Sequence, residues 1–204
     1  MGLNSTGRAQ LAITEVMTSA LETALGQGAD FFELTNFSTN SVDLTGYSWR
    51  ESKGILDSAP FDGVVIGPGE SIVFFRLSLT DTTNAHAFRR WWGLADNVRA
   101  IPWGLHPKLS SSQEDVHIRD ASGDLADSVA VGQAQKGASF TYDVKTGAFG
   151  VFSVEGRTGA FKAATADDVG SPGSTAGSVP PRIIEAPADL EVDGGQRSEE
   201  RRVG

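Results

Sequence analysis

Two glutamates lie inside short apolar blocks near the start of the chain, where carboxylates are uncommon. Glu15 belongs to the block 11–17 and Glu33 to the block 30–36. Paired carboxylates can serve as general acid and general base, or they can bind a cation. No third ligand or base has a recognisable position beside them. We therefore favour a structural interpretation, in which both accept hydrogen bonds from loop backbone or from neighbouring side chains.

The other candidate metal ligands in the sequence are three histidines and a cluster of aspartates. His86, His106 and His117 have no spacing that is typical of a metal site on one helix or strand. We expect them to be isolated loop or surface residues. The segment 120–124, followed by Asp127, lacks the Gly-to-Glu arrangement of a calcium loop. A hairpin turn accounts for it, and the sequence predicts neither a metal nor a cofactor.

One stretch of the chain combines basic and aromatic residues, and it is the candidate ligand site. Cations beside aromatic rings are suited to stacking on sugars or on bases. The alternative, which we favour, is that the rings cover the edge of the fold while the arginines stay in water. The candidate residues are Arg89, Arg90, Trp91, Trp92 and Trp103, with Arg99, His106 and Lys108 near them in the sequence.

The composition narrows the classes of function. A chain of 204 residues is long enough for one domain with flanking segments. The chain has 26 acidic and 17 basic residues, which gives a net charge of −9. This charge repels phosphate backbones and makes nucleic acid a disfavoured partner. No run reaches the roughly 18–20 apolar residues of a membrane span, so we expect no membrane insertion. The nucleophile elbow, the phosphate loop, His-Glu-x-x-His and the dinucleotide fingerprint are all absent, which argues against an enzyme.

Short apolar blocks rich in β-branched and aromatic residues recur along the chain and predict an all-β domain. The turn at 67–69 predicts a hairpin between the blocks 63–66 and 71–76, and the turn at 120–123 predicts a second hairpin. This rhythm of short strands is typical of a sandwich or a barrel. The predicted strands are 11–17, 30–36, 42–44, 47–50, 63–66, 71–76, 115–119, 124–131, 139–143 and 150–154.

The strand pattern is interrupted between Thr80 and Pro107. Phe88, Trp91, Trp92 and Ala95 recur at helical spacing in this segment. Either Thr82 or Thr83 could cap such a helix. The sequence therefore predicts a short inserted helix that is followed by a loop.

Changes in composition divide the chain into four parts. Residues 1–10 are expected to be a leader remnant or a disordered segment, and 11–174 to be the folded domain. Residues 175–196 have the composition of a linker and of the truncated start of a possible immunoglobulin-like repeat. Residues 197–204 match the translation of a common sequencing adapter, so we interpret them as an artefact.

Several blocks, read in order, resemble the lamin-tail domain of bacterial exported proteins. The resemblance implies an immunoglobulin-like β-sandwich without catalytic machinery. The long insertion from Thr80 to Ser112, with its predicted short helix, is the departure from the family pattern. The blocks are Ile13–Val16, Asp30–Asn36, Val42–Tyr47, Ile66–Ser71, Ile118–Gly123 with Asp127–Val129, and the closing Ser171–Gly173.

The same resemblance implies a function. It predicts a non-catalytic binding or attachment module of a larger exported bacterial protein, secreted or at the cell surface. The expected partners are an extracellular protein or glycan and neighbouring domains of the same chain. The alternative is nucleic-acid or nucleoprotein binding through the Arg/Trp insertion. The net negative charge of the chain argues against this alternative. A hydrolase that uses Glu15, Glu33 or the histidines is a third, less favoured hypothesis.

Overall fold

The computed structural model describes residues 11–21, 29–52, 54, 56–77, 84–105, 107–142 and 148–174. The predictions for 1–10, 175–196 and 197–204 lie outside these residues. The strands are β1 (Leu11–Met17), β2 (Phe31–Asn36), β3 (Val42–Asp43), β4 (Ser48–Glu51), β5 (Val65–Ile66), β6 (Ser71–Arg76), β7 (Arg99–Trp103), β8 (Glu114–Arg119), β9 (Leu125–Val131), β10 (Phe140–Tyr142), β11 (Phe149–Phe152), β12 (Phe161–Lys162) and β13 (Val169–Gly170), and the helices are the 3-10 turn η1 (Ala59–Phe61) and α1 (Ala85–Trp92).

A six-stranded sheet forms the centre of the molecule, with the strand order β11-β10-β1-β2-β6-β7. Its pairs are antiparallel except β6 and β7, which run parallel with α1 in the connection between them. Strands β1 and β2 are buried along their whole length. Such burial on both faces explains why apolar residues occur on both faces of these two strands.

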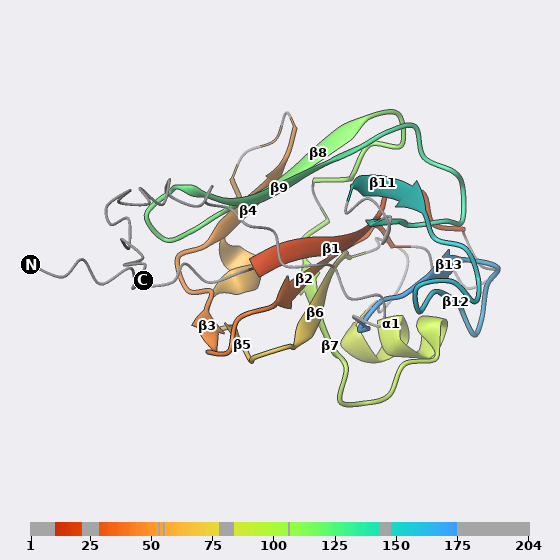
Figure 1. Ribbon diagram of the computed structural model, residues 1–204, viewed down its shortest axis with the longest axis horizontal. Helices are drawn as coiled ribbons and strands as arrows, with labels where there is room; N and C mark the ends of the chain where they lie inside the picture. Colours follow the sequence, from red (N-terminus) through yellow and green to blue (C-terminus); the bar gives the residue numbers. More distant parts are fainter. Residues whose placement is uncertain are drawn as a thin grey trace, which may run out of the picture.

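One face of this sheet packs against the three-stranded sheet β4-β8-β9, and the two sheets make a sandwich (Figure 1). Alternate residues of each strand point into the space between them, as the period of two requires. Phe32 of the large sheet stacks on Phe74 there and packs against Trp49 of β4, with the Phe32 and Trp49 ring centroids 5.0 Å apart. The predicted all-β sandwich with one short helical insertion is confirmed.

The opposite face of the large sheet is covered by α1 and by the segment around β12 and β13 (Figure 1). Phe31 and Phe75 point to this side, where they pack on Phe88 and Trp92 of the helix. Helix α1 begins at a capping Asn84, whose side chain accepts the backbone N–H of Ala87. The predicted cap residues Thr82 and Thr83 lie outside the described residues, so the cap observed is one that the sequence reading missed.

Two local predictions are wrong. The turn at 67–69 does not close a hairpin, because β5 pairs with β3 whereas β6 pairs with β2 and β7. Turn residues specify that the chain reverses, but they do not specify the strand that each arm pairs with. The segment after α1 is not only loop, because Arg99–Trp103 forms β7. Pro102 is compatible with this strand because β7 is an edge strand of the sheet.

Candidate functional site

The two glutamates singled out in the sequence meet on the helix-covered face of the large sheet. Glu15 of β1 and Glu33 of β2 are directly opposite each other in the antiparallel register. Their residues are 0% and 1% exposed. A register irregularity between Ile13 and Glu15 turns Glu15 to the same face as Glu33. The sheet therefore presents two carboxylates side by side to the segment that crosses this face.

That segment is residues 171–173, and both carboxylates bind its backbone. Ser171 donates its N–H to Glu15 Oε1 at 2.7 Å, and Gly173 donates its N–H to Glu33 Oε2 at 2.6 Å. Side-chain hydroxyls satisfy further oxygen positions, because Ser139 donates to Glu15 at 2.5 Å and Thr14 donates to Glu33 at 2.6 Å. We call this arrangement the carboxylate latch. The structural interpretation of the two glutamates is confirmed.

Burial sets the charge state of the latch. Loss of water raises the pKa of Glu15 to about 7, although the hydrogen bonds from Ser139 and Ser171 act in the opposite direction. Burial also raises the pKa of Glu33 well above its ordinary value, and the neighbouring charge of Glu15 raises it further. Two buried carboxylates this close resist simultaneous ionisation, so the pair holds a proton near neutral pH.

Two glycines allow the latched segment to lie so close to the sheet. A Cβ at Gly170 would stand 2.6 Å from Glu15 Oε1 and 2.9 Å from Trp92. Gly173 has a φ of +78°, and a Cβ there would stand 2.5 Å from Val98. The closing Ser-Pro-Gly block that the sequence shows is therefore a close-packing device as well as a turn.

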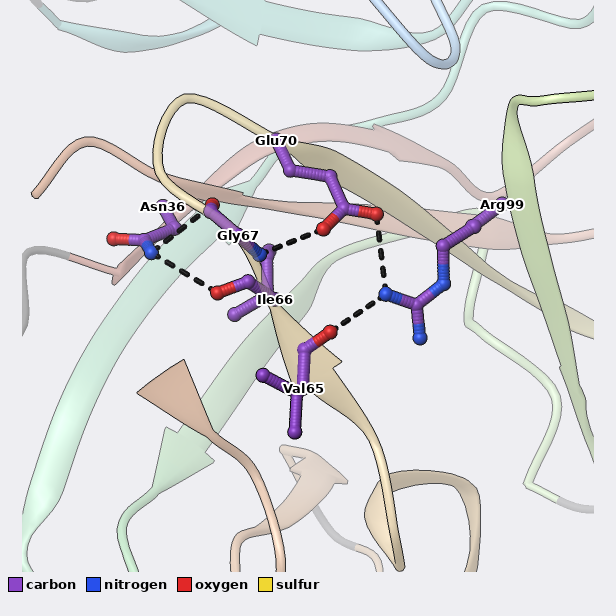
Figure 2. Close-up of polar contacts among 6 residues, drawn as sticks. All are labelled: Asn36, Val65, Ile66, Gly67, Glu70 and Arg99. Carbon is purple, nitrogen blue, oxygen red and sulfur yellow. Dashed lines mark hydrogen bonds and ion pairs between the residues drawn. The ribbon is translucent and has the colours of Figure 1, made fainter. Parts of the chain in front are cut away.

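A second polar network fixes the Pro-Gly turn that follows β5 (Figure 2). The buried Asn36 side chain donates to the carbonyls of Ile66 and Gly67 at 3.2 and 3.1 Å. Glu70 accepts the Gly67 N–H at 2.7 Å and forms an ion pair with Arg99 at 3.1 Å. Figure 2 shows that Arg99 also reaches the Val65 carbonyl, from which it is 2.6 Å away. This network joins β2, β5, β7 and the turn that leads into β6, and its polar groups are used in these internal contacts.

The five residues of the predicted ligand site are not presented on one surface. Trp91 and Trp92 are 2% and 1% exposed and pack on the helix-covered face of the large sheet. Trp103 is 2% exposed and lies in the sandwich core on the other face. Arg90 is exposed, and Arg89 is partly buried beside Asp96 and the Val98 carbonyl. Ligand binding at these positions stays a prediction, with the two arginines as its accessible part.

The remaining candidates have ordinary positions. His86 is exposed on α1, and His117 Nδ1 is 3.0 Å from the Ser128 hydroxyl, whereas His106 lies outside the described residues. Asp120 forms the tip of the β8–β9 hairpin and accepts the backbone N–H groups of Ser122 and Asp124, so the predicted hairpin turn is confirmed. The described residues contain no cluster of three or more metal-ligating side chains.

Two polar hollows open beside the segment 107–113, and sequence reasoning missed both. Their lining residues come from distant segments, so no local spacing could have revealed them. The larger hollow has a volume of about 620 Å³ and is lined by Glu51, Ser52, Lys108, Ser110, Ser112, Gln113 and Asp115. The smaller has a volume of about 250 Å³ and is lined by Thr18, Ser19, Ala20, Asp30, Arg76, Lys108, Ser111 and Lys136.

Comparison with known families assigns the fold. A family model described as Lamin Tail Domain matches residues 4–133, which is more than half of the chain. The chain belongs to the lamin tail domain family. The resemblance predicted from the sequence is confirmed, and so is the immunoglobulin-like class of the sandwich. Domains of this family are non-catalytic immunoglobulin-like modules of larger proteins.

Described residues beyond the matched part pack onto it. Strand β10 lies outside the matched residues but pairs with β1, and the latch joins residues 171–173 to β1 and β2. A search of the curated proteins found no match. Within the part of the chain that the structure describes, no helix has the length and apolar character needed to cross a membrane.

Proposed function

We propose that this lamin tail domain is a non-catalytic binding and attachment module of a larger exported bacterial protein. In this role it binds an extracellular protein or glycan and positions a neighbouring domain of the same chain. The observation that carries the proposal is the carboxylate latch. The two residues best suited to acid-base chemistry are both engaged in holding residues 171–173.

The burial of the latch supports a non-catalytic role. A general acid or base must come within hydrogen-bond reach of a proton on the substrate. The oxygens of Glu15 and Glu33 instead face internal donors, and neither residue is more than 1% exposed. A substrate could reach them only if the segment 171–173 left the sheet.

The latch also supports a positioning role. It fixes the backbone of Ser171 and Gly173 to β1 and β2, so the chain after Ser174 starts from a point held rigidly by the sandwich. A neighbouring domain attached beyond this point is therefore tethered at a defined place on the sandwich. The export part of the proposal rests on the resemblance to bacterial exported members, and immunolocalisation of the native protein in medium, envelope and cytosol tests it.

Binding and turnover can be measured together on the full chain. The chain is titrated with a panel of oligosaccharides and peptides while NMR shifts report binding and mass spectrometry reports products. Binding without products supports the module. Product formation that Glu15→Gln or Glu33→Gln abolishes overturns it, and so does a panel in which nothing binds.

Spin labels can test the positioning role. The chain has no cysteine, so a label attaches only at cysteines that are introduced for the purpose. Labels at Ser122→Cys and Ser174→Cys report the distance between the β8–β9 turn and the latched end. We expect one narrow distance distribution that broadens in Glu33→Ala but not in Asp96→Ala, which alters an exposed carboxylate. A broad distribution of label-to-label distances in the labelled chain with both glutamates intact would contradict the positioning role.

A further inference from the structure

The smaller polar hollow is built by five separate segments of the chain. Thr18 and Ser19 follow β1, Asp30 precedes β2, and Arg76 ends β6. The β7–β8 connection adds Lys108 and Ser111, and the β9–β10 connection adds Lys136. We call this hollow the cationic pocket.

The charge of the cationic pocket is opposite to that of the whole chain. Three cations and one carboxylate line it, in a protein whose net charge is −9. The carboxylate of Asp30 is already paired with Arg76, with Arg76 Nε 3.4 Å from Asp30 Oδ2. Lys108 and Lys136 are exposed, and neither forms an ion pair with a described residue. Lys108 attracts the Asp30 carboxylate and Lys136 attracts that of Asp168, so the pocket offers an anion two exposed ammonium groups whose charge is only partly balanced.

Buried polar atoms in the cationic pocket lack hydrogen-bond partners. Thr18 is only 2% exposed, and its hydroxyl oxygen has no partner among the described residues. Arg76 Nε is also buried without a hydrogen bond, because its approach to Asp30 does not meet the geometry of one. An unsatisfied buried hydroxyl or guanidinium N–H is costly, and a bound polar ligand is one way to satisfy it.

The lining indicates the chemical class of this ligand. Hydroxyls of Thr18, Ser19 and Ser111 stand beside the two lysines, and none of the lining residues is aromatic. Serine and threonine hydroxyls can both donate to and accept from sugar hydroxyls, while ammonium groups pair with a carboxylate or a sulfate. A nucleobase would find no ring to stack on. A volume of about 250 Å³ is of the size of one sugar unit rather than of a folded chain segment.

We propose that the cationic pocket binds one acidic sugar unit of an extracellular glycan, with its carboxylate or sulfate between Lys108 and Lys136. The sugar hydroxyls bind the Thr18 hydroxyl and the neighbouring serines. This inference rests on the proposed function and names the class of its partner. It differs from the Arg/Trp candidate, which shares no residue with the pocket apart from the nearby Lys108.

The test is an NMR titration of the full chain with glucuronate, glucose 6-sulfate, glucose and inorganic sulfate. We expect the two acidic sugars to shift the signals of residues 18–20 and 111, and glucose to leave them unchanged. Lys108→Gln and Lys136→Gln should each weaken binding about tenfold, the effect of one charged hydrogen bond. Arg157→Gln is the matched control, since it removes one exposed cation that does not line the pocket.

Thr18→Val separates a ligand contact from a structural role. The valine has nearly the same shape without the unpartnered hydroxyl, so the fold should be retained while acidic sugars bind several-fold more weakly. Affinity unchanged in Thr18→Val and in both lysine variants overturns the site. Inorganic sulfate bound as tightly as glucose 6-sulfate overturns the sugar assignment, and so does an acidic peptide from the binding panel that binds the pocket more tightly than either acidic sugar.

The two proposals fail in different ways. If acidic sugars do not bind while another member of the oligosaccharide and peptide panel does, the pocket assignment is wrong and the binding module stands. If a panel member is turned over, the non-catalytic module is wrong, whereas the pocket is judged on its own titration.

Discussion

Glu15 and Glu33 face each other across β1 and β2, and each accepts a backbone N–H from the same closing segment. The donors are Ser171, at 2.7 Å from Glu15 Oε1, and Gly173, at 2.6 Å from Glu33 Oε2. Two residues that are far from residues 171–173 in sequence thus decide where that segment lies. The latch makes the fold sensitive to the protonation of this pair.

The first prediction concerns the pH dependence of stability. The pKa values of Glu15 and Glu33 are raised in the folded state, so between the ordinary value of 4.5 and about 7 the folded chain holds more protons than the unfolded one. Stability therefore falls as pH rises through this window. We expect a larger free energy of unfolding near pH 5 than near pH 8, measured by urea denaturation.

Glu33→Gln tests whether the latch causes this dependence. Glutamine keeps an oxygen that can accept the Gly173 N–H but cannot ionise, so the fall in stability with pH should become shallower. Asp30, whose burial raises its pKa to about 6, contributes with the same sign in both proteins and is not affected by the change. Parallel pH profiles of the two proteins would show that the pair is not the origin.

The second prediction concerns Gly170, which lies against Glu15 of the latch and Trp92 of α1. Gly170→Ala places a methyl group 2.6 Å from Glu15 Oε1 and 2.9 Å from Trp92, so the segment must move off the sheet. We expect a loss of about 1–3 kcal/mol in the free energy of unfolding, the usual cost of overpacking. Gly132→Ala is the control, because a Cβ there meets nothing within 4 Å. Equal stabilities of the two variants would contradict this account.

The third prediction compares two members of the turn network in Figure 2. Asn36 is buried and donates to backbone carbonyls on two segments, including that of Asn40 at 2.7 Å, so Asn36→Ala should destabilise by about 2 kcal/mol. The Arg99 side chain is 40% exposed, so Arg99→Ala should cost less than about 1 kcal/mol. Thermal unfolding of both variants checks which substitution costs more stability. A larger loss in Arg99→Ala would show that the arginine contributes more than Asn36 to the stability of the turn.

The outline of the fold could be predicted from the sequence because local pattern decides it. The blocks around Glu15 and Glu33 are apolar on both faces, and the turn at Asp120 has residues that favour reversal, so strands and one hairpin followed directly. Glu33, Asn36 and the closing Gly173 belong to the blocks in which the family resemblance was found, although Gly173 lies beyond the matched residues 4–133. Those residues are the ones that hold the latch and the turn network.

The pairing of distant elements could not be predicted in this way. The sequence indicates that the chain turns at Gly67, but only packing decides that β5 joins β3 and β6 joins β2. The same holds for β7, whose Pro102 is acceptable only at a sheet edge. The cationic pocket draws Thr18, Arg76 and Lys136 together from segments without any common motif.

The fourth prediction concerns the Arg/Trp insertion and the nucleic-acid hypothesis. All four tryptophans of the chain are at most 2% exposed, so iodide should quench their fluorescence weakly in the folded chain and strongly after denaturation. Trp91→Ala should cost about 3–5 kcal/mol of stability, because the ring packs on Phe88 and its N–H binds Asp168. Quenching of the native chain at the level of the denatured one would contradict the packing.

The same prediction has a second part, which concerns DNA binding by the two arginines of this helix. Arg90 is exposed and Arg89 is only partly so, and buried rings cannot stack on bases beside them. We expect double-stranded DNA to bind weakly in a fluorescence-anisotropy titration, since the chain carries a net charge of −9. The variant Arg89→Ala with Arg90→Ala should leave that weak binding and its salt dependence nearly unchanged. Tight binding whose slope against salt is reduced in the double variant would instead make the insertion a nucleic-acid site and displace the glycan proposal as the main function of the domain.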